Sequence, residues 1–162
     1  MTKAFGKSSI SDGDIKIDKE GVWFFRGAEM FRKDFVDLFY QHIKQDTDGR
    51  YFIQYGDETS YLDVEDKAFV VKSVHKTCSK NDGKECIELL LSDGTVEILE
   101  PDTLYIGCNN VLYCHVKERC FEARFLRPSY YQIAEFIEHD PVNDRFLISL
   151  NRETHYIKAL DE

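Results

Sequence analysis

The chain has 162 residues, 43% of them hydrophobic, and a formal net charge of −9, so it is long enough to bury a sizeable core. An acidic surface repels phosphate groups, which argues against general binding to nucleic acids or anionic membranes. No apolar run approaches the ~18–20 residues of a membrane-spanning helix, and the N-terminus lacks the apolar core of a signal peptide. The five cysteines are odd in number and form no CxxC motif, which fits a reducing compartment, so we expect a cytoplasmic protein.

The first third of the chain predicts a β-β-α-β-β unit. Alternating apolar residues at 15–17 and 22–26 flank the turn Lys19-Glu20-Gly21, as in a hairpin. Strands are also expected at 51–55 and 62–64. Between them an amphipathic helix is predicted to end at Asp48-Gly49, with an apolar stripe made of Phe31, Phe35, Leu38, Phe39, His42 and Ile43. These elements define a first domain at residues 14–66.

The remainder of the chain, residues 67–162, predicts a second domain that is mainly β. Strand patterns recur at 69–74, 85–91, 95–99, 104–106, 111–116 and 121–125, and a closing hairpin is expected across Asn151-Arg152. A short helix is predicted to begin near Pro128 and to continue as far as Ile137. No internal repeat is apparent. The fold class expected for the whole chain is α+β, with an antiparallel β-roll or barrel-like second part.

Residues 15–71 resemble a bacterial family known as domain of unknown function family 1285. The resemblance depends on the order and spacing of Gly21-Val22-Trp23-Phe24-Phe25, Gly27, Arg32, Phe39, Asp48-Gly49-Arg50-Tyr51, Val64-Glu65-Asp66 and Ala68-Phe69. It implies an α+β protein in two parts and no particular activity. The chain departs from the family at residues 54–58, where members tend to carry Pro-x-Glu-Lys, and at Ala68, where they prefer proline.

The densest carboxylate cluster consists of Asp63, Glu65 and Asp66. Asp63 and Glu65 should share one face of a strand, because side chains two residues apart point the same way. Such carboxylates could hold Mg²⁺ or Ca²⁺, or act as general acid and base. Alternatively, Glu65 or Asp66 could form an ion pair with Arg26 or Arg32 that fixes the helix against the sheet. Candidate binding residues are therefore Arg32, Asp63, Glu65 and Asp66.

Histidines and cysteines suggest zinc only weakly. The candidates are His75 with Cys78 and Cys86, or a second group of Cys108, Cys114, His115 and Cys120. Structural zinc usually shows closely spaced ligands twice over, and the spacing occurs here once. Cys114 and His115 are adjacent in a predicted strand and should point to opposite faces, so they would not form a catalytic pair. We therefore expect no metal, no cofactor and no catalytic residue.

One basic segment lies beside aromatic residues and could contact bases or phosphates. Its cations are Lys117, Arg119, Arg124 and Arg127. Glu118 and Glu122 lie within the same segment and reduce its charge, so a solvated strand face is the preferred interpretation. No nucleic-acid partner is expected.

The function indicated by these patterns is that of a non-enzymatic cytoplasmic module that binds an unknown protein or small molecule. The alternative is an enzyme that binds a small molecule or a metal through Asp63, Glu65 and Asp66. A homodimer formed through sheet faces or edges is also possible, because β-rich proteins often cover edges in this way. No membrane partner is expected.

Overall fold

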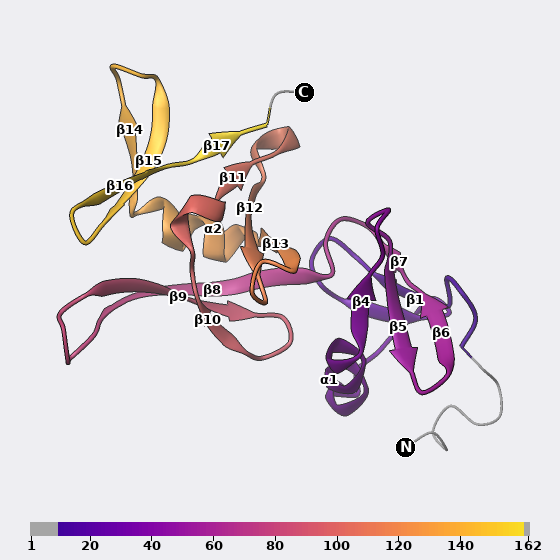
Figure 1. The fold of residues 1–162 in the computed structure, drawn as a ribbon. Coiled ribbons are helices and arrows are strands. Elements are labelled where there is room, and N and C mark those ends of the chain that lie inside the picture. Colours follow the sequence, from indigo (N-terminus) through magenta and orange to yellow (C-terminus); the bar gives the residue numbers. More distant parts are fainter. Residues whose placement is uncertain (1–9, 161–162) are drawn as a thin grey trace. The chain divides into compact units, whose positions relative to one another are not determined.

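The computed structural model describes residues 10–160 of the chain. The chain divides into two compact units, residues 1–68 and 69–162, which we call unit 1 and unit 2 (Figure 1). The boundary falls between Ala68 and Phe69, at the first residue of the long strand β8 (Phe69–Cys78). No helix in the described part of the chain is long and apolar enough to cross a membrane.

Unit 1 contains one described helix and two small sheets. In chain order its elements are β1 (Ile15–Ile17), β2 (Trp23–Phe25), β3 (Ala28–Glu29), α1 (Lys33–Gln41), β4 (Ile43–Gln45), β5 (Tyr51–Tyr55), β6 (Glu58–Tyr61) and β7 (Asp63–Val64). One sheet has the order β3-β2-β1-β7 and the other β4-β5-β6. The predicted hairpin and helix are confirmed, and short strands β3 and β4 extend the expected pattern.

The core of unit 1 is built on the hairpin and on one side of α1. Ile15 and Ile17 are fully buried, as their alternation predicts. The Trp23 ring stacks on Phe39 at 6.0 Å between centroids and meets Tyr40 edge-on at 4.8 Å. The Tyr40 hydroxyl donates a hydrogen bond of 2.9 Å to the carbonyl of Ala68. The helix is thereby fixed to the hairpin by aromatic contacts, and to the segment that follows β7 by one buried polar contact.

The predicted apolar stripe of the helix is partly wrong. Phe31 precedes α1 and is 83% exposed. Ile43 is buried, but it lies in β4 and pairs with Ile53 of β5. The helical spacing continues past the helix end because the first residue of the next strand also faces the core. The helix itself ends at Gln41.

Unit 2 contains a seven-stranded sheet of order β10-β9-β8-β13-β12-β11-β17 and a three-stranded sheet of order β14-β15-β16. Its elements are β8 (Phe69–Cys78), β9 (Glu85–Leu91), β10 (Val96–Ile98), η2 (Pro101–Thr103), β11 (Tyr105–Ile106), η3 (Cys108–Asn110), β12 (Leu112–Val116), β13 (Phe121–Phe125), α2 (Arg127–Ala134), β14 (Ile137–Asp140), β15 (Arg145–Leu150), β16 (Glu153–Tyr156) and β17 (Lys158–Ala159).

The strand pairing of unit 2 is mostly antiparallel, with parallel contacts of β13 with β8 and of β11 with β17. The large sheet does not close into a barrel, since its terminal strands β10 and β17 are not paired with each other. The expected α+β class with a largely antiparallel second part and a short helix is confirmed. Ile137, predicted in the helix, lies instead in β14, opposite Ile148.

Both units contain the same succession of a helix, a three-stranded antiparallel meander and a short return strand. In unit 1 the return strand β7 pairs in parallel with β1, and in unit 2 the return strand β17 pairs in parallel with β11 (Figure 1). The two meanders also share residues at matching register positions. The identical pairs are Ile43 and Ile137, Asp46 and Asp140, Arg50 and Arg145, Ile53 and Ile148, Glu58 and Glu153, Thr59 and Thr154, and Tyr61 and Tyr156.

This internal repeat was not expected from the sequence. The loop between the first two strands of the meander is one residue longer in unit 2, which shifts the alignment. Most of the residues between the shared positions also differ. The expectation of no repeat is therefore wrong, and the two units share one topological plan.

Candidate functional site

The predicted carboxylates lie at the return strand of unit 1. Asp63 is exposed in β7, opposite Lys16 of β1. The Glu65 carboxylate accepts a hydrogen bond of 2.8 Å from the backbone N–H of Lys19. Asp66 is half-buried. Glu65 therefore holds the turn between β1 and β2, which is a structural task.

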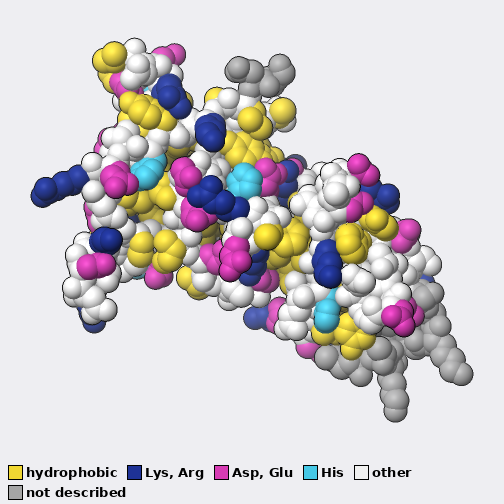
Figure 2. All heavy atoms as spheres, viewed as in Figure 1, with side chains coloured by type: hydrophobic (Ala, Val, Ile, Leu, Met, Phe, Trp, Pro, Cys, Tyr) yellow, Lys and Arg dark blue, Asp and Glu magenta, His cyan; other side chains and the backbone are white. Residues whose placement is uncertain are grey.

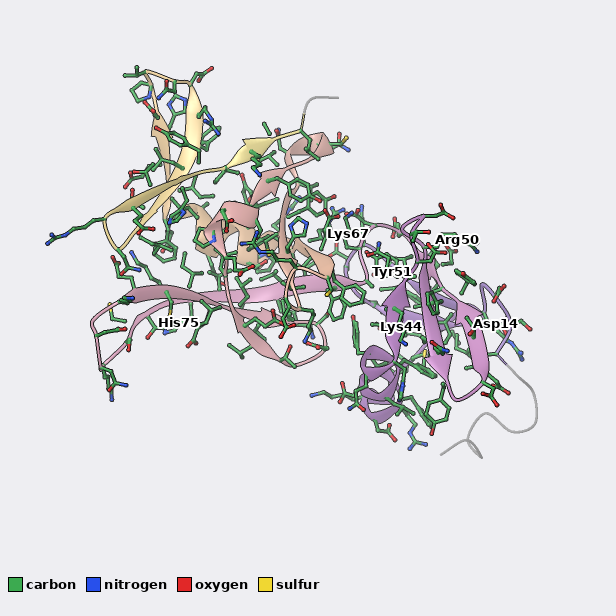
Figure 3. The ribbon with its side chains drawn as sticks, in the orientation of Figure 1. Asp14, Lys44, Arg50, Tyr51, Lys67 and His75 are labelled. Atoms are coloured by element: carbon green, nitrogen blue, oxygen red, sulfur yellow. The ribbon has the colours of Figure 1, made fainter. Side chains whose placement is uncertain are left out.

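The two arginines expected to pair with these carboxylates have other partners. Arg26 forms an ion pair of 3.3 Å with Asp14, which is labelled in Figure 3. Arg32 forms an ion pair of 2.8 Å with Asp34 at the N-terminus of α1. Its hydrogen bonds hold the pKa of Asp34 below the ordinary value. Within residues 10–160, Arg32 is therefore not brought together with the three predicted carboxylates.

The cysteines do not assemble into a metal site in the described part of the chain. All five are free, and no group of three or more His, Cys, Asp or Glu residues among those described could hold a metal ion. Cys114 is buried on the inner face of β12, and burial raises the pKa of its thiol well above the ordinary value. The half-buried His115 is the next residue of the same strand, so the two side chains point to opposite faces.

Two cations of the predicted basic segment, Lys117 and Arg119, form ion pairs with separate carboxylates. Lys117 Nζ lies 2.6 Å from Asp93 and 3.3 Å from Glu97. Arg119 lies 2.8 Å from Glu100 and 3.0 Å from Asp102, and its hydrogen bonds lower the pKa of Asp102. Residues 117–119 all have positive φ, a sparsely populated conformation that these contacts maintain. Figure 2 likewise shows charges of both signs interspersed over the visible face.

One face of the large sheet carries a row of polar and aromatic side chains. Register places Lys158 opposite Tyr105, Tyr105 opposite Tyr113, and Tyr113 opposite Arg124. The two tyrosine rings stack at 5.1 Å between centroids, with 17° between their planes. Gly107 lies against this stack, because a Cβ there would come within 2.8 Å of the Tyr113 ring. The row is therefore held in a fixed arrangement.

A hollow of about 450 Å³ opens beside this row, and we call it the His115 pocket. Its lining residues come from the segments before and within β11, from β12, β13 and the turn between them, and from β17 and its end. They are Asp102, Thr103, Tyr105, His115, Arg119, Glu122, Lys158 and Leu160. Within the described residues, Lys158 is the lining cation whose ammonium group has no ion-pair partner, since Arg119 is held by two carboxylates.

His115 is fixed by its backbone and by a neighbouring acid. Its N–H donates a hydrogen bond of 3.1 Å to the Thr103 hydroxyl, and its Nε2 lies 3.6 Å from a Glu122 oxygen. Its Nδ1 is buried and has no hydrogen-bond partner among the described residues. A buried polar atom without a partner is costly and is found mainly at functional sites or where water is trapped. The ring is therefore the most chemically unusual group in the pocket.

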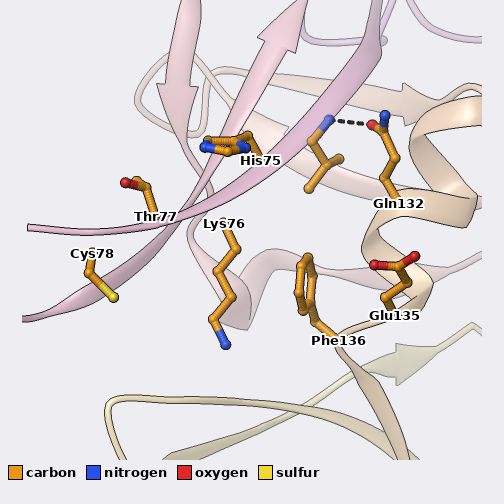
Figure 4. A pocket seen from close by; sticks show the side chains of 8 residues that line it. His75, Lys76, Thr77, Cys78, Gln132, Glu135 and Phe136 are labelled. Atoms are coloured by element: carbon orange, nitrogen blue, oxygen red, sulfur yellow. Dashed lines mark hydrogen bonds between the residues drawn. The ribbon is translucent and has the colours of Figure 1, made fainter.

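A second hollow of about 480 Å³ in unit 2 lies between β8 and the end of α2 (Figure 4). It is lined by Val74, His75, Lys76, Thr77, Cys78, Gln132, Glu135 and Phe136. The Gln132 side chain accepts a hydrogen bond of 2.7 Å from the backbone N–H of Val74. We call this hollow the β8 groove.

A third hollow of about 530 Å³, in unit 1, is lined by Ile10, Ser11, Asp12, Glu58, Thr59 and Ser60. The Ser60 hydroxyl donates a hydrogen bond of 2.6 Å to the Ile10 carbonyl, and the Asp12 carboxylate accepts one of 3.0 Å from the N–H of Tyr61. These contacts attach residues 10–12 to β6, so the polar groups here are occupied in folding.

None of the four predicted binding residues lines one of these three hollows. Sequence reasoning noticed His115, Arg119 and Glu122 for other reasons and overlooked Tyr105 and Lys158. The internal repeat is the one feature that relates Lys158 to a predicted site residue. Asp63 lies opposite Lys16 of β1, just as Lys158 lies opposite Tyr105 of β11. The predicted Asp63 thus occupies in unit 1 the position of Lys158 in unit 2.

Two solved structures have the same fold as this chain. A DUF1285 family protein from Silicibacter pomeroyi DSS-3 has 21% sequence identity and a TM-score of 0.75, over 91% of this chain and 81% of that one. A DUF1285 family protein from Shewanella baltica OS155 has 18% identity and a TM-score of 0.60, over 76% of this chain and 91% of that one. No protein with a curated description matches the sequence.

Residues 6–67 match the N-terminal domain of a domain of unknown function, DUF1285. This segment contains the hairpin, α1 and the first meander, where the sequence resemblance was found. The expected family resemblance is therefore confirmed at residues 6–67, which match the N-terminal domain of the DUF1285 family.

Proposed function

We propose that this chain is a non-enzymatic binding module that holds a small molecule with an anionic group in the His115 pocket. The observation that carries the proposal is the Lys158 ammonium group, which lines the pocket and forms no ion pair within residues 10–160. Arg119 is already held by Glu100 and Asp102. Lys158 is therefore the cation available to a ligand carboxylate or phosphate.

The pocket walls support binding because they are ordered before a ligand arrives. Tyr105 is buried and stacked on Tyr113, and the Thr103 hydroxyl both donates to the Glu100 carbonyl and accepts from the N–H of His115. Side chains held by a sheet lose little freedom on binding, which favours affinity. A planar apolar part of the ligand would lie against Tyr105, with its anionic end toward Lys158.

The alternative function is an enzyme based on Asp63, Glu65 and Asp66. Glu65 is used by the turn at Lys19, and Arg32 is held by Asp34. Asp63 is exposed and lines none of the three hollows. These placements favour the binding module over the enzyme.

The proposal extends to the setting of the protein. Five free cysteines support a cytoplasmic location, where thiols remain reduced. The sources of the two related structures support a bacterial origin. The ion pairs of Lys117 and Arg119 support the absence of a nucleic-acid partner, because these cations are already neutralised. The compact division near residue 68 supports two domains, as expected at 14–66 and 67–162.

The test is a titration of the full chain with acetate, inorganic phosphate and benzoate, followed by NMR shifts of the His115 ring and the Tyr105 amide. We expect at least one of these anions to bind in the millimolar range or better. Lys158→Met should weaken that binding about tenfold or more, because it removes a charge-assisted contact.

Lys80→Met is the matched control, since Lys80 is an exposed lysine outside the three hollows. It should bind as the natural chain does. Failure of all three anions to shift the His115 and Tyr105 signals would overturn the proposal. So would equal binding by the Lys158→Met variant and the natural chain.

A further inference from the structure

Strand β8 has a free edge along its second half. It spans Phe69–Cys78, but β13 pairs only with its first three residues, Phe69 to Val71. On the other side β9 accompanies β8 as far as Cys78. From Lys72 onward, the edge that faces away from β9 has no strand beside it in the described part of the chain. Unpaired edges of this kind are places where another strand can be added.

The first part of this free edge is covered by α2 and the residue before it. The Val71 carbonyl accepts hydrogen bonds from the Leu126 N–H at 3.2 Å and from the Ser129 hydroxyl at 2.6 Å. The Val74 N–H donates to the Gln132 side chain at 2.7 Å, as it would to the carbonyl of a neighbouring strand. The helix thus replaces a strand as far as Val74.

The cover ends where the β8 groove begins. Hydrogen bonding in an antiparallel ladder alternates, so the main-chain groups of Lys76 and Cys78 face the same way as those of Val74. Ser79 follows this alternation, because its N–H donates a hydrogen bond of 2.8 Å to the Lys84 carbonyl, on the side of β8 that faces β9. Donors and acceptors at strand spacing therefore face the groove, whose other wall is formed by Gln132, Glu135 and Phe136 (Figure 4).

The charges of the groove favour a basic occupant. Lys76 Nζ is neutralised by Glu85 at 2.8 Å, and it lies 5.2 Å from the centre of the Phe136 ring. Glu135 is exposed and has no ion-pair partner among the described residues. The groove therefore keeps one negative charge without an ion-pair partner among the described residues, the Glu135 carboxylate. This carboxylate lies beside the Phe136 ring and the unpaired strand edge.

We propose that the β8 groove is a docking site for an extended, basic peptide segment of a partner protein, which adds a strand to β8 at Lys76–Cys78. Main-chain hydrogen bonds to Lys76 and Cys78 provide the pairing, as in other cases of strand addition. A lysine or arginine of the peptide pairs with Glu135, and an apolar side chain packs on Phe136. This site is separate from the His115 pocket, because the two share no lining residue.

The experiment uses the full chain and two blocked pentapeptides, one alternating valine with lysine and the other alternating valine with glutamate. Amide hydrogen exchange of Lys76 and Cys78 is followed by NMR. The lysine peptide should slow exchange at both amides, and the glutamate peptide should bind at least about tenfold more weakly. A lysine peptide methylated on alternate backbone nitrogens should not protect them, because it cannot form the ladder.

Glu135→Lys should reverse the preference between the two peptides. Glu138→Lys is the matched control, since Glu138 is an exposed glutamate of β14 outside the groove, and it should leave the preference unchanged. Unprotected Lys76 and Cys78 amides with every peptide would overturn the proposal, as would equal binding of the two peptides. Protection that appears without peptide and rises with protein concentration, with a dimer mass by light scattering, would assign the edge to a second copy instead.

Discussion

The Tyr156 hydroxyl donates a hydrogen bond of 3.0 Å to the Asp140 carboxylate, and Tyr61 makes the same bond to Asp46 at 3.2 Å in the other unit. In each case an arginine lies over the tyrosine ring: the Arg145 guanidinium is 4.4 Å from the ring centre of Tyr156, and that of Arg50 (Figure 3) is 3.9 Å from the ring centre of Tyr61. The repeat is therefore preserved in its interactions as well as in its topology.

The carboxylates in these two contacts should make stability depend on pH. Hydrogen bonds from Asn143 and Tyr156 hold the pKa of Asp140 below its ordinary value. A carboxyl whose pKa is lowered by folding stabilises the fold above its unfolded pKa, and this stabilisation is lost as the pH falls through the folded value. We expect Asp140→Asn to reduce the loss of stability between about pH 6 and about pH 3.

Urea unfolding of the natural chain and of Asp140→Asn at the two pH values measures this effect. Asp144→Asn is the control, because Asp144 is a nearby, exposed aspartate whose contact is with His139. An unchanged pH dependence in Asp140→Asn would contradict the prediction.

Arg32 should matter less for stability than Tyr40. The Arg32 side chain is 68% exposed and pairs with an exposed Asp34, so Arg32→Ala should leave the melting temperature nearly unchanged. Tyr40 is buried and donates to the Ala68 carbonyl, so Tyr40→Phe leaves that group unsatisfied and should cost about 1–2 kcal/mol. Thermal and urea unfolding of both variants would decide, and a larger loss in Arg32→Ala would refute this ranking.

Gly107 should be intolerant of a side chain because of Tyr113. A Cβ at position 107 would lie 2.8 Å from the Tyr113 ring, so Gly107→Ala must displace the tyrosine stack and should cost about 1–3 kcal/mol. The double variant Gly107→Ala with Tyr113→Leu should lose less than the sum of the single variants, because the obstructing ring is gone. Strictly additive effects in urea unfolding would disprove this cause.

Cys114 should resist alkylation in the folded chain. It is buried and the pKa of its thiol is raised by burial, whereas Cys78, Cys108 and Cys120 are exposed. Iodoacetamide at about pH 8 followed by mass spectrometry should label the exposed cysteines first. Addition of urea should bring Cys114 to the same rate, and rapid labelling of Cys114 without urea would show that the prediction is wrong.

Local patterns in the sequence were sufficient to predict the hairpin of β1 and β2 and the presence of a helix in unit 1, but not the short strands β3 and β4. Ile15 and Ile17 alternate with polar residues, and a buried hairpin strand results. The same reasoning failed at Ile43 and Ile137, because each follows a helix and faces the core from a strand. Periodicity reports which residues face a core, and it does not report where the backbone changes from helix to strand.

The candidate sites could not be found in this way, because both depend on register between distant segments. Lys158 meets Tyr105 only when the return strand pairs with β11. The free edge at Lys76 exists only because β13 stops pairing with β8 at Val71. The cluster of Asp63, Glu65 and Asp66 could be predicted because its members are close in sequence. Residues that are close in sequence need not line a common pocket, however, and these three line none of the three hollows.

The return strands affect the order in which the protein can fold during synthesis. Strand β11 is made early in unit 2, yet its neighbour β17 comes only after the helix and the whole second meander. The edge of β11 therefore remains open while the intervening chain emerges from the ribosome. Pairing between segments so far apart is slow to form, so we expect the completion of this sheet, which brings Lys158 to the His115 pocket, to be a late step of folding.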